Sequence, residues 1–326
     1  MYLVLRRTSL LALGLVLALA FGGATAQPYP SRPIRIVAPF PASGGVDLSA
    51  RVIGLKLGER LGTTVVVDNR PGAGGILGTD IVAKAPADGY TLLLGSTGTI
   101  TAGPAVFKTL PYDPVKDFVA VGGIQSVPLV LTAAPKTPVS TYAEFVSLAN
   151  SRKGQLSVAS AGSGSSNHLA IELLMRMAAL KLLHVPYKGS GPAITDLLGS
   201  QVVSMMDQLT ASIGHIREGR IKALAITSRS RSPLLPNVPT LDELGVKGYE
   251  ASTFTGIFAP AGTPQAVLSK LSSALGKALR NETVRERYRS MGVEIIDSSQ
   301  AEFAAFVRAD LEKWRRVARE GNIVVD

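Results

Sequence analysis

Residues 34–47 read IRIVAPFPASGGVD, and this stretch determines the fold that we expect. Its first five residues, Ile34–Ala38, predict a buried strand, and the residues rich in proline and glycine that follow them end it. From Val46 to Leu61, apolar residues recur at spacings of four and three, which predicts a helix with one apolar face. A strand that passes through a glycine-rich loop into a helix is typical of an α/β protein.

A second stretch, residues 156–166, reads LSVASAGSGSS and repeats this arrangement in the other half of the chain. A short apolar strand ends in a loop of glycine and serine, and a helix is expected from about residue 166. The first N–H groups of a helix have no partner inside it, and the helix dipole favours negative charge there. Two such loops, one in each half of the chain, predict a clamp for a small carboxylate.

The expected binding residues lie in these two loops and at the ends of other strands. Glycines allow the backbone to approach a ligand closely, serine hydroxyls donate hydrogen bonds, and Asp47 is expected to cap the helix that follows it. The first loop supplies Phe40, Ser43, Gly44, Gly45 and Asp47, and the second supplies Ser160, Gly162, Ser163, Gly164, Ser165 and His168. The other strand ends supply Ser96, Thr97, Tyr187 and Asp207.

Several of these residues have a second interpretation that the sequence leaves open. His168 is a candidate catalytic base, but a helix N-terminus disfavours an imidazolium, which favours a neutral structural histidine. Tyr187 is expected to line the cleft, whereas Lys188 fits a charged ligand contact or a solvated side chain equally well. Asp207 either selects an amino group of the ligand or caps a helix expected at residues 210–218.

No pattern in the sequence indicates a metal, a nucleotide cofactor or a covalent catalyst. The histidines at positions 168, 184 and 215 are not at metal-ligand spacing. Residues 70–78 are rich in glycine, but Leu77 stands where a dinucleotide-binding loop requires its third glycine. The second loop is not a Gly-x-Ser-x-Gly nucleophile elbow. We therefore expect no cofactor, no metal and no enzymatic activity, and an exported α/β hydrolase is the alternative that these patterns disfavour.

The N-terminal residues and the composition indicate an exported protein. Arg6 and Arg7, the apolar residues 10–21 and the small residues 24–26 predict a signal peptide that is cleaved after residue 26. The sequence has no cysteine, so we expect neither disulfides nor a lipid anchor at the cleavage site. The formal net charge is +10, but the basic residues alternate with glutamates on predicted helices, which disfavours a nucleic-acid partner. We expect a monomer in the periplasm of a bacterium with two membranes.

Alternating strands and helices predict parallel sheets in two domains. Strands are expected at residues 34–38, 64–67, 91–95, 128–133, 156–160, 183–186, 202–206 and 222–227. Helices are expected at residues 46–61, 75–85, 140–150, 166–180, 191–198, 210–218, 264–279, 282–290 and 299–319. The chain is expected to cross between domains near residues 125 and 228. Residues 27–125 and 228–326 would then form one domain, and residues 126–227 the other.

A series of short motifs follows in order along the chain. They are PFPASGGVD (39–47), NRPGAGG (69–75), ADGYTLL (87–93), LPYDP with DF (110–118), HVPYKG (184–189), DLLG (196–199), PNVPT (236–240) and APAGTP (259–264). In this order they resemble the Bug family of periplasmic solute-binding receptors of tripartite tricarboxylate transporters, over essentially the whole chain after the signal peptide. The sequence departs from the family pattern at Ser43, where glycine is usual, and at Gly103, where asparagine often precedes the proline.

The resemblance implies a type II periplasmic-binding-protein fold, in which two Rossmann-like α/β domains around a ligand cleft are joined by a two-segment hinge. It implies that residues 40–47 and 160–166 hold one carboxylate, partly through ordered water, while Thr97, Tyr187 and Asp207 read the far end of the ligand. The implied ligands are di- and tricarboxylates, amino acids and aromatic acids. The implied partners are the membrane subunits of a tripartite tricarboxylate transporter. A carboxylate sensor that docks on a sensor kinase has the same fold and is an open alternative.

Overall fold

The strand, loop and helix at residues 34–61 form as the sequence predicts. The computed structural model describes residues 28–40, 42, 45–290 and 292–325. β1 (Ile34–Ala38) precedes α2 (Gly45–Leu61), and the predicted apolar face of α2 is buried, with Ile53 0% and Leu57 1% exposed. The predicted signal peptide, Ser43 and Gly44 lie outside the described residues.

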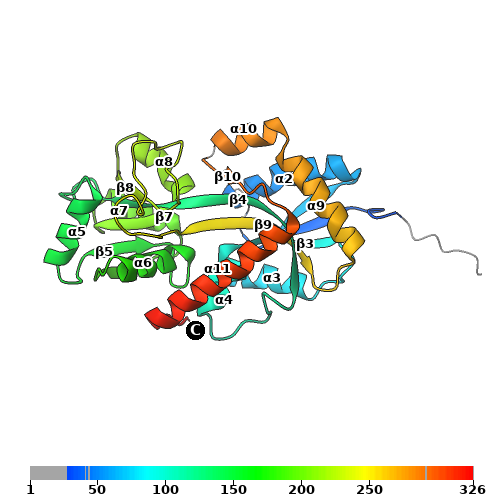
Figure 1. Ribbon diagram of the computed structural model, residues 1–326, viewed down its shortest axis with the longest axis horizontal. Coiled ribbons are helices and arrows are strands. Elements are labelled where there is room, and N and C mark those ends of the chain that lie inside the picture. Colours follow the sequence, from blue (N-terminus) through cyan, green and yellow to red (C-terminus); the bar gives the residue numbers. More distant parts are fainter. Residues whose placement is uncertain (1–27, 41, 43–44, 291, 326) are drawn as a thin grey trace, which may run out of the picture. The chain divides into compact units, whose positions relative to one another are not determined.

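Within the described residues, ten strands form one sheet (Figure 1). Beside β1 these are β2 (Val65–Asn69), β3 (Thr91–Ser96), β4 (Phe118–Ala133), β5 (Ser157–Ser160), β6 (Leu183–Pro186), β7 (Ser204–Gln208), β8 (Lys222–Ile226), β9 (Ser252–Pro260) and β10 (Glu294–Ile295). Neighbouring strands follow the order β2-β1-β3-β9-β4-β7-β5-β6, and β8 and β10 also pair with β4.

The prediction of parallel sheets is confirmed for β1–β3 and β5–β7 and is wrong for β4 and β9, which run antiparallel to their neighbours. β1 is parallel to β2 and β3, and β5 is parallel to β6 and β7. β9 lies between β3 and β4 and is antiparallel to both, while β4 is also antiparallel to β7 and β8. β4 begins at Phe118 rather than at the predicted residue 128, so one continuous strand passes through the predicted crossing near residue 125. The prediction of two domains is not decided by this pairing and stays a prediction.

The predicted helices are all present, with ends that differ by a few residues. They are α2, α3 (Ile76–Ala83), α5 (Tyr142–Ser151), α6 (Ser166–Met177), α7 (Ser190–Leu198), α8 (Leu209–Arg217), α9 (Gln265–Leu279), α10 (Glu282–Ser290) and α11 (Gln300–Gly321). The 3₁₀-helix η1 (Ala73–Gly75), the π-helix η2 (Thr97–Thr101) and α4 (Ala102–Val106) were not expected. None of the described helices is both long and apolar enough to cross a membrane.

The long C-terminal helix α11 contributes to two apolar clusters. Phe303, near its start, is buried in a cluster that includes Leu93 and Phe258. Trp314, three turns further on, is buried in a second cluster that includes Leu131 of β4. Each buried apolar side chain of this size stabilises the fold by roughly 1.5–3 kcal/mol. α11 therefore connects the core around β1 and β3 with the core around the second half of β4.

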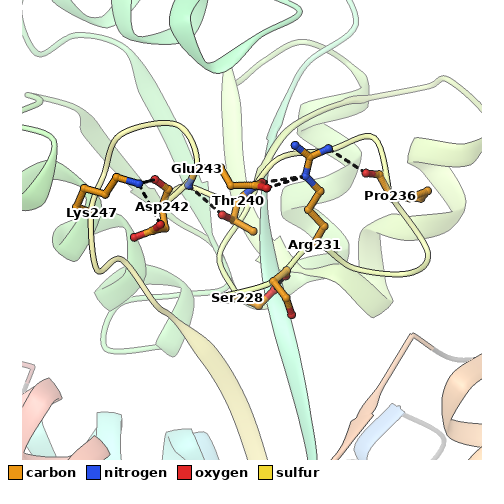
Figure 2. Close-up of polar contacts among 8 residues, drawn as sticks. Ser228, Arg231, Pro236, Thr240, Asp242, Glu243 and Lys247 are labelled. Carbon is orange, nitrogen blue, oxygen red and sulfur yellow. Dashed lines mark hydrogen bonds and ion pairs between the residues drawn. The ribbon is translucent and has the colours of Figure 1, made fainter.

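The long connection between β8 and β9 is held together by its own polar residues (Figure 2). Arg231 Nε donates to Glu243 Oε2 at 2.9 Å, and the N–H of Thr240 donates to the same carboxylate oxygen at 2.7 Å. The N–H of Glu243 in turn donates to Thr240 Oγ1 at 3.1 Å. Lys247 pairs with Asp242 at 3.3 Å further along the connection. These local bonds give residues 228–250 a defined conformation without a strand or an α-helix.

Candidate binding site

The loop between β5 and α6 has a shape that its own serines and glycines maintain. Ser165 caps α6, because its Oγ accepts from the N–H of His168 at 3.2 Å and donates to the carbonyl of Gly162 at 2.6 Å. The Oγ of Ser160, a fully buried residue, accepts from the N–H of Gly162 at 3.1 Å. Gly162 and Gly164 have φ angles of 139° and 75°, which L side chains rarely adopt. The loop therefore requires glycine at both positions.

Two stacked histidines are bonded to this loop. The N–H of Gly164 donates to Nδ1 of His168 at 3.1 Å, and Ser160 Oγ lies 2.6 Å from Nε2 of His184. The two imidazole rings are nearly parallel, with centroids 3.9 Å apart and an angle of 9° between the planes. Since Nδ1 of His168 accepts a hydrogen bond, the other ring nitrogen, Nε2, is the donor of this ring, and it lies 3.5 Å from Glu172 Oε1. These contacts fit the interpretation of His168 as a structural histidine.

We expect His184 to make protein stability depend on pH between 6.5 and about 4. Burial, and to a smaller extent the charge of His168, lowers the pKa of His184 from 6.5 to about 4. Between these values the unfolded chain binds a proton that the folded protein does not, so the free energy of unfolding decreases as pH falls, by at most about 3 kcal/mol. Urea unfolding at pH 7 and pH 4.5 measures this decrease. His184→Gln is the control, because its side chain does not titrate, and an equally large decrease in that variant would contradict the assignment.

Backbone N–H groups at the start of α6 are free to bind a ligand. In the described part of the chain, the N–H groups of Ser163, Ser166 and Asn167 have no hydrogen-bond partner. Ser166 and Asn167 belong to the first turn of α6, where the helix has no acceptor for them. The positive end of the helix dipole adds to their attraction for a negative charge. This arrangement favours a carboxylate at this end of α6.

These groups lie in the wall of a pocket of about 310 Å³. Of the predicted binding residues, the structure places Phe40, Ser96, Thr97, Gly162, Ser163, Gly164 and Ser165 in its lining. The other lining residues are Gly74, Gly98, Phe107, Gln125, Val127, Ala161, Ser166, Asn167, Gln208, Thr253, Phe254 and Thr255. Within the described residues, none of the lining side chains is ionisable. The charge of an anion in this pocket is therefore met by N–H groups, hydroxyls and helix dipoles.

The paired strands β4 and β9 supply polar side chains to this pocket. Gln125 faces Thr255 in the register of these strands, and Val127 faces Thr253, so alternate residues of each strand point to the same side. The hydroxyl of Thr253 is used within the protein, since it donates to the carbonyl of Val127 at 3.2 Å. In contrast, Oε1 of Gln125 and Oγ1 of Thr255 are buried and have no hydrogen-bond partner among the described residues.

Five predicted residues whose surroundings the structure describes do not line this pocket, and most of them have partners elsewhere. They are Asp47, Ser160, His168, Tyr187 and Asp207. Gly45 is the first residue of α2, and the structure does not describe its surroundings. Asp47 accepts from Arg51 Nε at 2.9 Å and from Asn69 Nδ2 at 2.8 Å, which holds the start of α2 against the end of β2. The hydroxyl of Tyr187 donates to Asp196 at 2.7 Å. The residues are close to the site in sequence, but their polar atoms support the loops and helices around it.

Asp207 is a fully buried acceptor at the end of β7 that joins three helices. Its Oδ1 accepts from Ser190 Oγ of α7 at 2.6 Å and from Asn167 Nδ2 of α6 at 3.1 Å. Its Oδ2 accepts from Ser212 Oγ of α8 at 3.3 Å. Burial raises the pKa of Asp207 above its usual value, although these hydrogen bonds act in the opposite direction. Through Asn167, Asp207 helps to position the first turn of α6 at the pocket.

The sequence analysis did not identify Gln125, Thr253 and Thr255 as pocket residues, although the sequence contains a weak indication of them. Gln125 is one of three polar residues, with Ser126 and Thr132, in the mainly apolar stretch 118–133, and Thr253 and Thr255 flank Phe254 in β9. Polar side chains on the inner face of a buried strand are unusual and indicate a site. They become recognisable as one group only when the pairing of β4 with β9 is known. The described residues contain no group of three His, Asp or Glu side chains that could hold a metal ion.

Comparisons with known proteins give a consistent picture. Residues 49–323 match the family model TctC, described as "Tripartite tricarboxylate transporter family receptor". BugT of Bordetella pertussis is 37% identical over 297 residues, which is 91% of each chain. The structure of Rpa4515 of R. palustris with adipate has a TM-score of 0.82 and 35% identity, covering 91% of this chain and 99% of the other. The structure of MatC of Rhodopseudomonas palustris with bound malate has a TM-score of 0.77 and 36% identity, covering 89% and 99%.

Proposed function

Because the chain belongs to the TctC family of tripartite tricarboxylate transporter receptors, we propose that it captures a small carboxylate in the periplasm and delivers it to the membrane subunits of such a transporter. The observation that carries this proposal is the start of α6. There, free N–H groups, serine hydroxyls and the helix dipole converge on a pocket whose described lining has no ionisable side chain. Relatives with bound adipate and bound malate support a carboxylate as the ligand.

The carboxylate is held in this proposal by the loop between β5 and α6. The N–H groups of Ser166 and Asn167 donate to one oxygen of the carboxylate. The N–H or the hydroxyl of Ser163 donates to the other oxygen. Hydrogen bonds to an ionised group are worth about 1.5–3 kcal/mol each, so three of them account for much of the roughly 8 kcal/mol of a micromolar complex. Gly162 and Gly164 keep the backbone free of side chains where the ligand approaches.

We propose that binding closes two domains, residues 27–125 with 228–326 and residues 126–227. The pocket is lined by residues from both, such as Thr97 from the first and Ser163 from the second. A ligand that contacts both domains only when they are closed stabilises the closed state by its difference in affinity for the two states. β4 carries the chain through the proposed crossing near residue 125, so bending is expected in the middle of β4 and near residue 228, where the chain returns to the first domain.

We propose that the protein is exported and that it does not catalyse a reaction. Residues 1–26 serve as a cleavable signal peptide, and the mature protein acts as a monomer. The serines of the pocket have no general base beside them within the described lining, since His168 and His184 are bonded to the loop and do not line the pocket. The protein therefore binds its ligand without changing it.

A thermal-unfolding screen against small acids tests this function directly. Adipate, malate, monocarboxylates, amino acids and aromatic acids are added to purified protein that has been freed of bound ligand by unfolding and refolding. A ligand at 100 times its Kd stabilises the folded state by about 2.7 kcal/mol, which raises the Tm of a protein of this size by about 4 °C. The methyl ester of each acid that raises the Tm, with every carboxyl group esterified, is the control without a carboxylate and should give no rise. If no acid raises the Tm of the folded protein, the proposal is wrong.

A further inference from the structure

We propose that Gln125 and Thr255 form a second, neutral subsite of the pocket, which hydrogen-bonds an uncharged polar group at the far end of the carboxylate ligand. The chemical class is a small monocarboxylate whose other end is a hydroxyl or an amide. This inference rests on the proposed function, because it assumes that the carboxylate itself is held at the start of α6.

The first observation is the pair of unsatisfied oxygen atoms. Gln125 is 3% exposed and Thr255 is 4% exposed, and both line the pocket. Oε1 of Gln125 and Oγ1 of Thr255 have no hydrogen-bond partner among the described residues. A buried polar atom without a partner destabilises the folded protein, so such atoms are rare unless something binds to them. Two of them on facing positions of adjacent strands indicate a place where a polar group of the ligand completes the hydrogen bonding.

The second observation is the difference between these residues and their neighbour Thr253. Thr253 lies on the same strand and the same side as Thr255, and it also lines the pocket. Its hydroxyl donates to the carbonyl of Val127 at 3.2 Å and accepts from Gln208 Nε2 at 3.3 Å. Thr253 therefore has no free hydrogen-bonding capacity comparable to that of Thr255. Among the polar pocket residues Gln125, Thr253 and Thr255 of these two strands, only Gln125 and Thr255 have a buried side-chain oxygen without a partner among the described residues.

The charge of the pocket determines the class of the group that binds there. A carboxamide oxygen accepts a hydrogen bond, and a threonine hydroxyl both donates and accepts. A hydroxyl or amide on the ligand can satisfy both residues at once. A second ionised carboxylate would lose its hydration without meeting a cation, since the described lining has no Lys, Arg or His side chain. Phe107, Val127 and Phe254 supply apolar surface in the same pocket for a hydrocarbon segment between the two polar ends.

Matched acids that differ only at the far end test this subsite. The probes are hexanoate, 6-hydroxyhexanoate, the monoamide of adipate, and adipate, together with the corresponding four-carbon and five-carbon series, measured by calorimetry at pH 7.5. We expect the hydroxy acid or the monoamide of one chain length to bind about ten times more tightly than the plain monocarboxylate and than the dicarboxylate. Gln125→Leu and Thr255→Val should each reduce this preference, taken as the ratio of the two Kd values measured in the same variant, by about three- to tenfold. Thr253→Val is the matched control and should keep the preference.

The outcomes separate this inference from the proposed function. If several acids bind but the dicarboxylate or the plain monocarboxylate binds best, or if the Gln125 and Thr255 variants keep the wild-type preference, the neutral subsite is refuted while the carboxylate receptor stands. If none of the acids binds to the folded protein, the proposed function fails and this inference fails with it. A preference that disappears in Thr253→Val as well as in Thr255→Val also contradicts the subsite, because it would show a general disturbance of β9.

Discussion

Replacing Ser163 by aspartate is expected to weaken carboxylate binding by about 100-fold while leaving the protein folded. Ser163 is exposed in the β5–α6 loop, lines the pocket, and lies three residues before the first helical residue of α6. An aspartate there places a negative charge where the ligand carboxylate is proposed to bind. Two like charges about 4 Å apart near a protein surface repel by up to roughly 4 kcal/mol, and partial screening by solvent reduces this to the 2–3 kcal/mol of a 100-fold change.

The stability of this variant separates a binding effect from misfolding. An acidic side chain near a helix N-terminus is favourable by about 0.3–1 kcal/mol, so the Tm of Ser163→Asp without ligand should equal or exceed that of the wild type. Ser163→Asn is the matched control, since it has nearly the same shape as the aspartate without its charge, and it should bind within about fivefold of the wild type. Calorimetric titration with the acid that gives the largest Tm rise measures both variants. Equal affinities for the aspartate and asparagine variants would remove the start of α6 from the proposed site.

The parts of the fold that depend on local pattern were predictable from the sequence. The spacing of Ile53, Leu57 and Leu61 fixes the face of α2 that packs on the sheet, and the run Leu183–Pro186 forms the strand that its apolar character predicts. The glycine and serine residues of 160–166 were expected to form an anion-binding loop before a helix, and the structure places most of them in the pocket wall. In each of these cases the information lies within about fifteen residues of sequence.

The parts that depend on long-range pairing were not predictable in the same way. β9 pairs with β3 and β4, but its residues follow a long connection whose turns gave no indication of a strand. Missing β9 led to the prediction of parallel sheets and concealed Thr253 and Thr255 as lining residues. Gln125 was overlooked for the same reason, since a lone glutamine in an apolar strand acquires meaning only when its partner across the strand pair is known.

The same limit applies to the residues that were assigned to the ligand but have structural partners. Asp47 and His168 were chosen because they lie beside glycine-rich loops, and Asp207 was chosen because it follows a predicted strand. Their hydrogen bonds join α2 to β2, the loop to α6, and β7 to three helices. The sequence shows that a polar residue is near a site. Whether its side chain bonds to the ligand or to another part of the protein depends on the tertiary packing. Asp207 is the residue for which this distinction has the largest consequence.

Replacing Asp207 by alanine is expected to destabilise the protein by about 3–4 kcal/mol. The alanine leaves the side-chain donors of Asn167, Ser190 and Ser212 without their acceptor in a buried environment, and each lost partner costs about 1–3 kcal/mol, part of which the hydroxyls recover by turning to other acceptors. Carboxylate affinity should also fall, because Asn167 then keeps only the carbonyl of Met206 as the partner of its Nδ2 atom. Urea unfolding of both proteins at pH 7 measures the difference in the free energy of unfolding.

The asparagine variant decides whether Asp207 acts as a hydrogen-bond acceptor within the fold or as a charge that faces the ligand. Asn keeps an acceptor oxygen for Ser190 and Asn167, and the hydroxyl of Ser212 can turn to accept from the new amide, so Asp207→Asn should lose about 1 kcal/mol or less and bind within threefold of the wild type. Burial raises the pKa of Asp207 above 3.8, so at neutral pH the wild type bears the cost of a buried charge that the amide avoids. The difference in stability should therefore shift in favour of Asp207→Asn as pH rises from 3.8 towards neutrality. If Asp207→Asn instead retained its stability but lost the binding of an amino acid, the carboxylate would have to face the ammonium group of the ligand. The hydrogen bonds of Asp207 to α6, α7 and α8 would then be less important than its contact with the ligand.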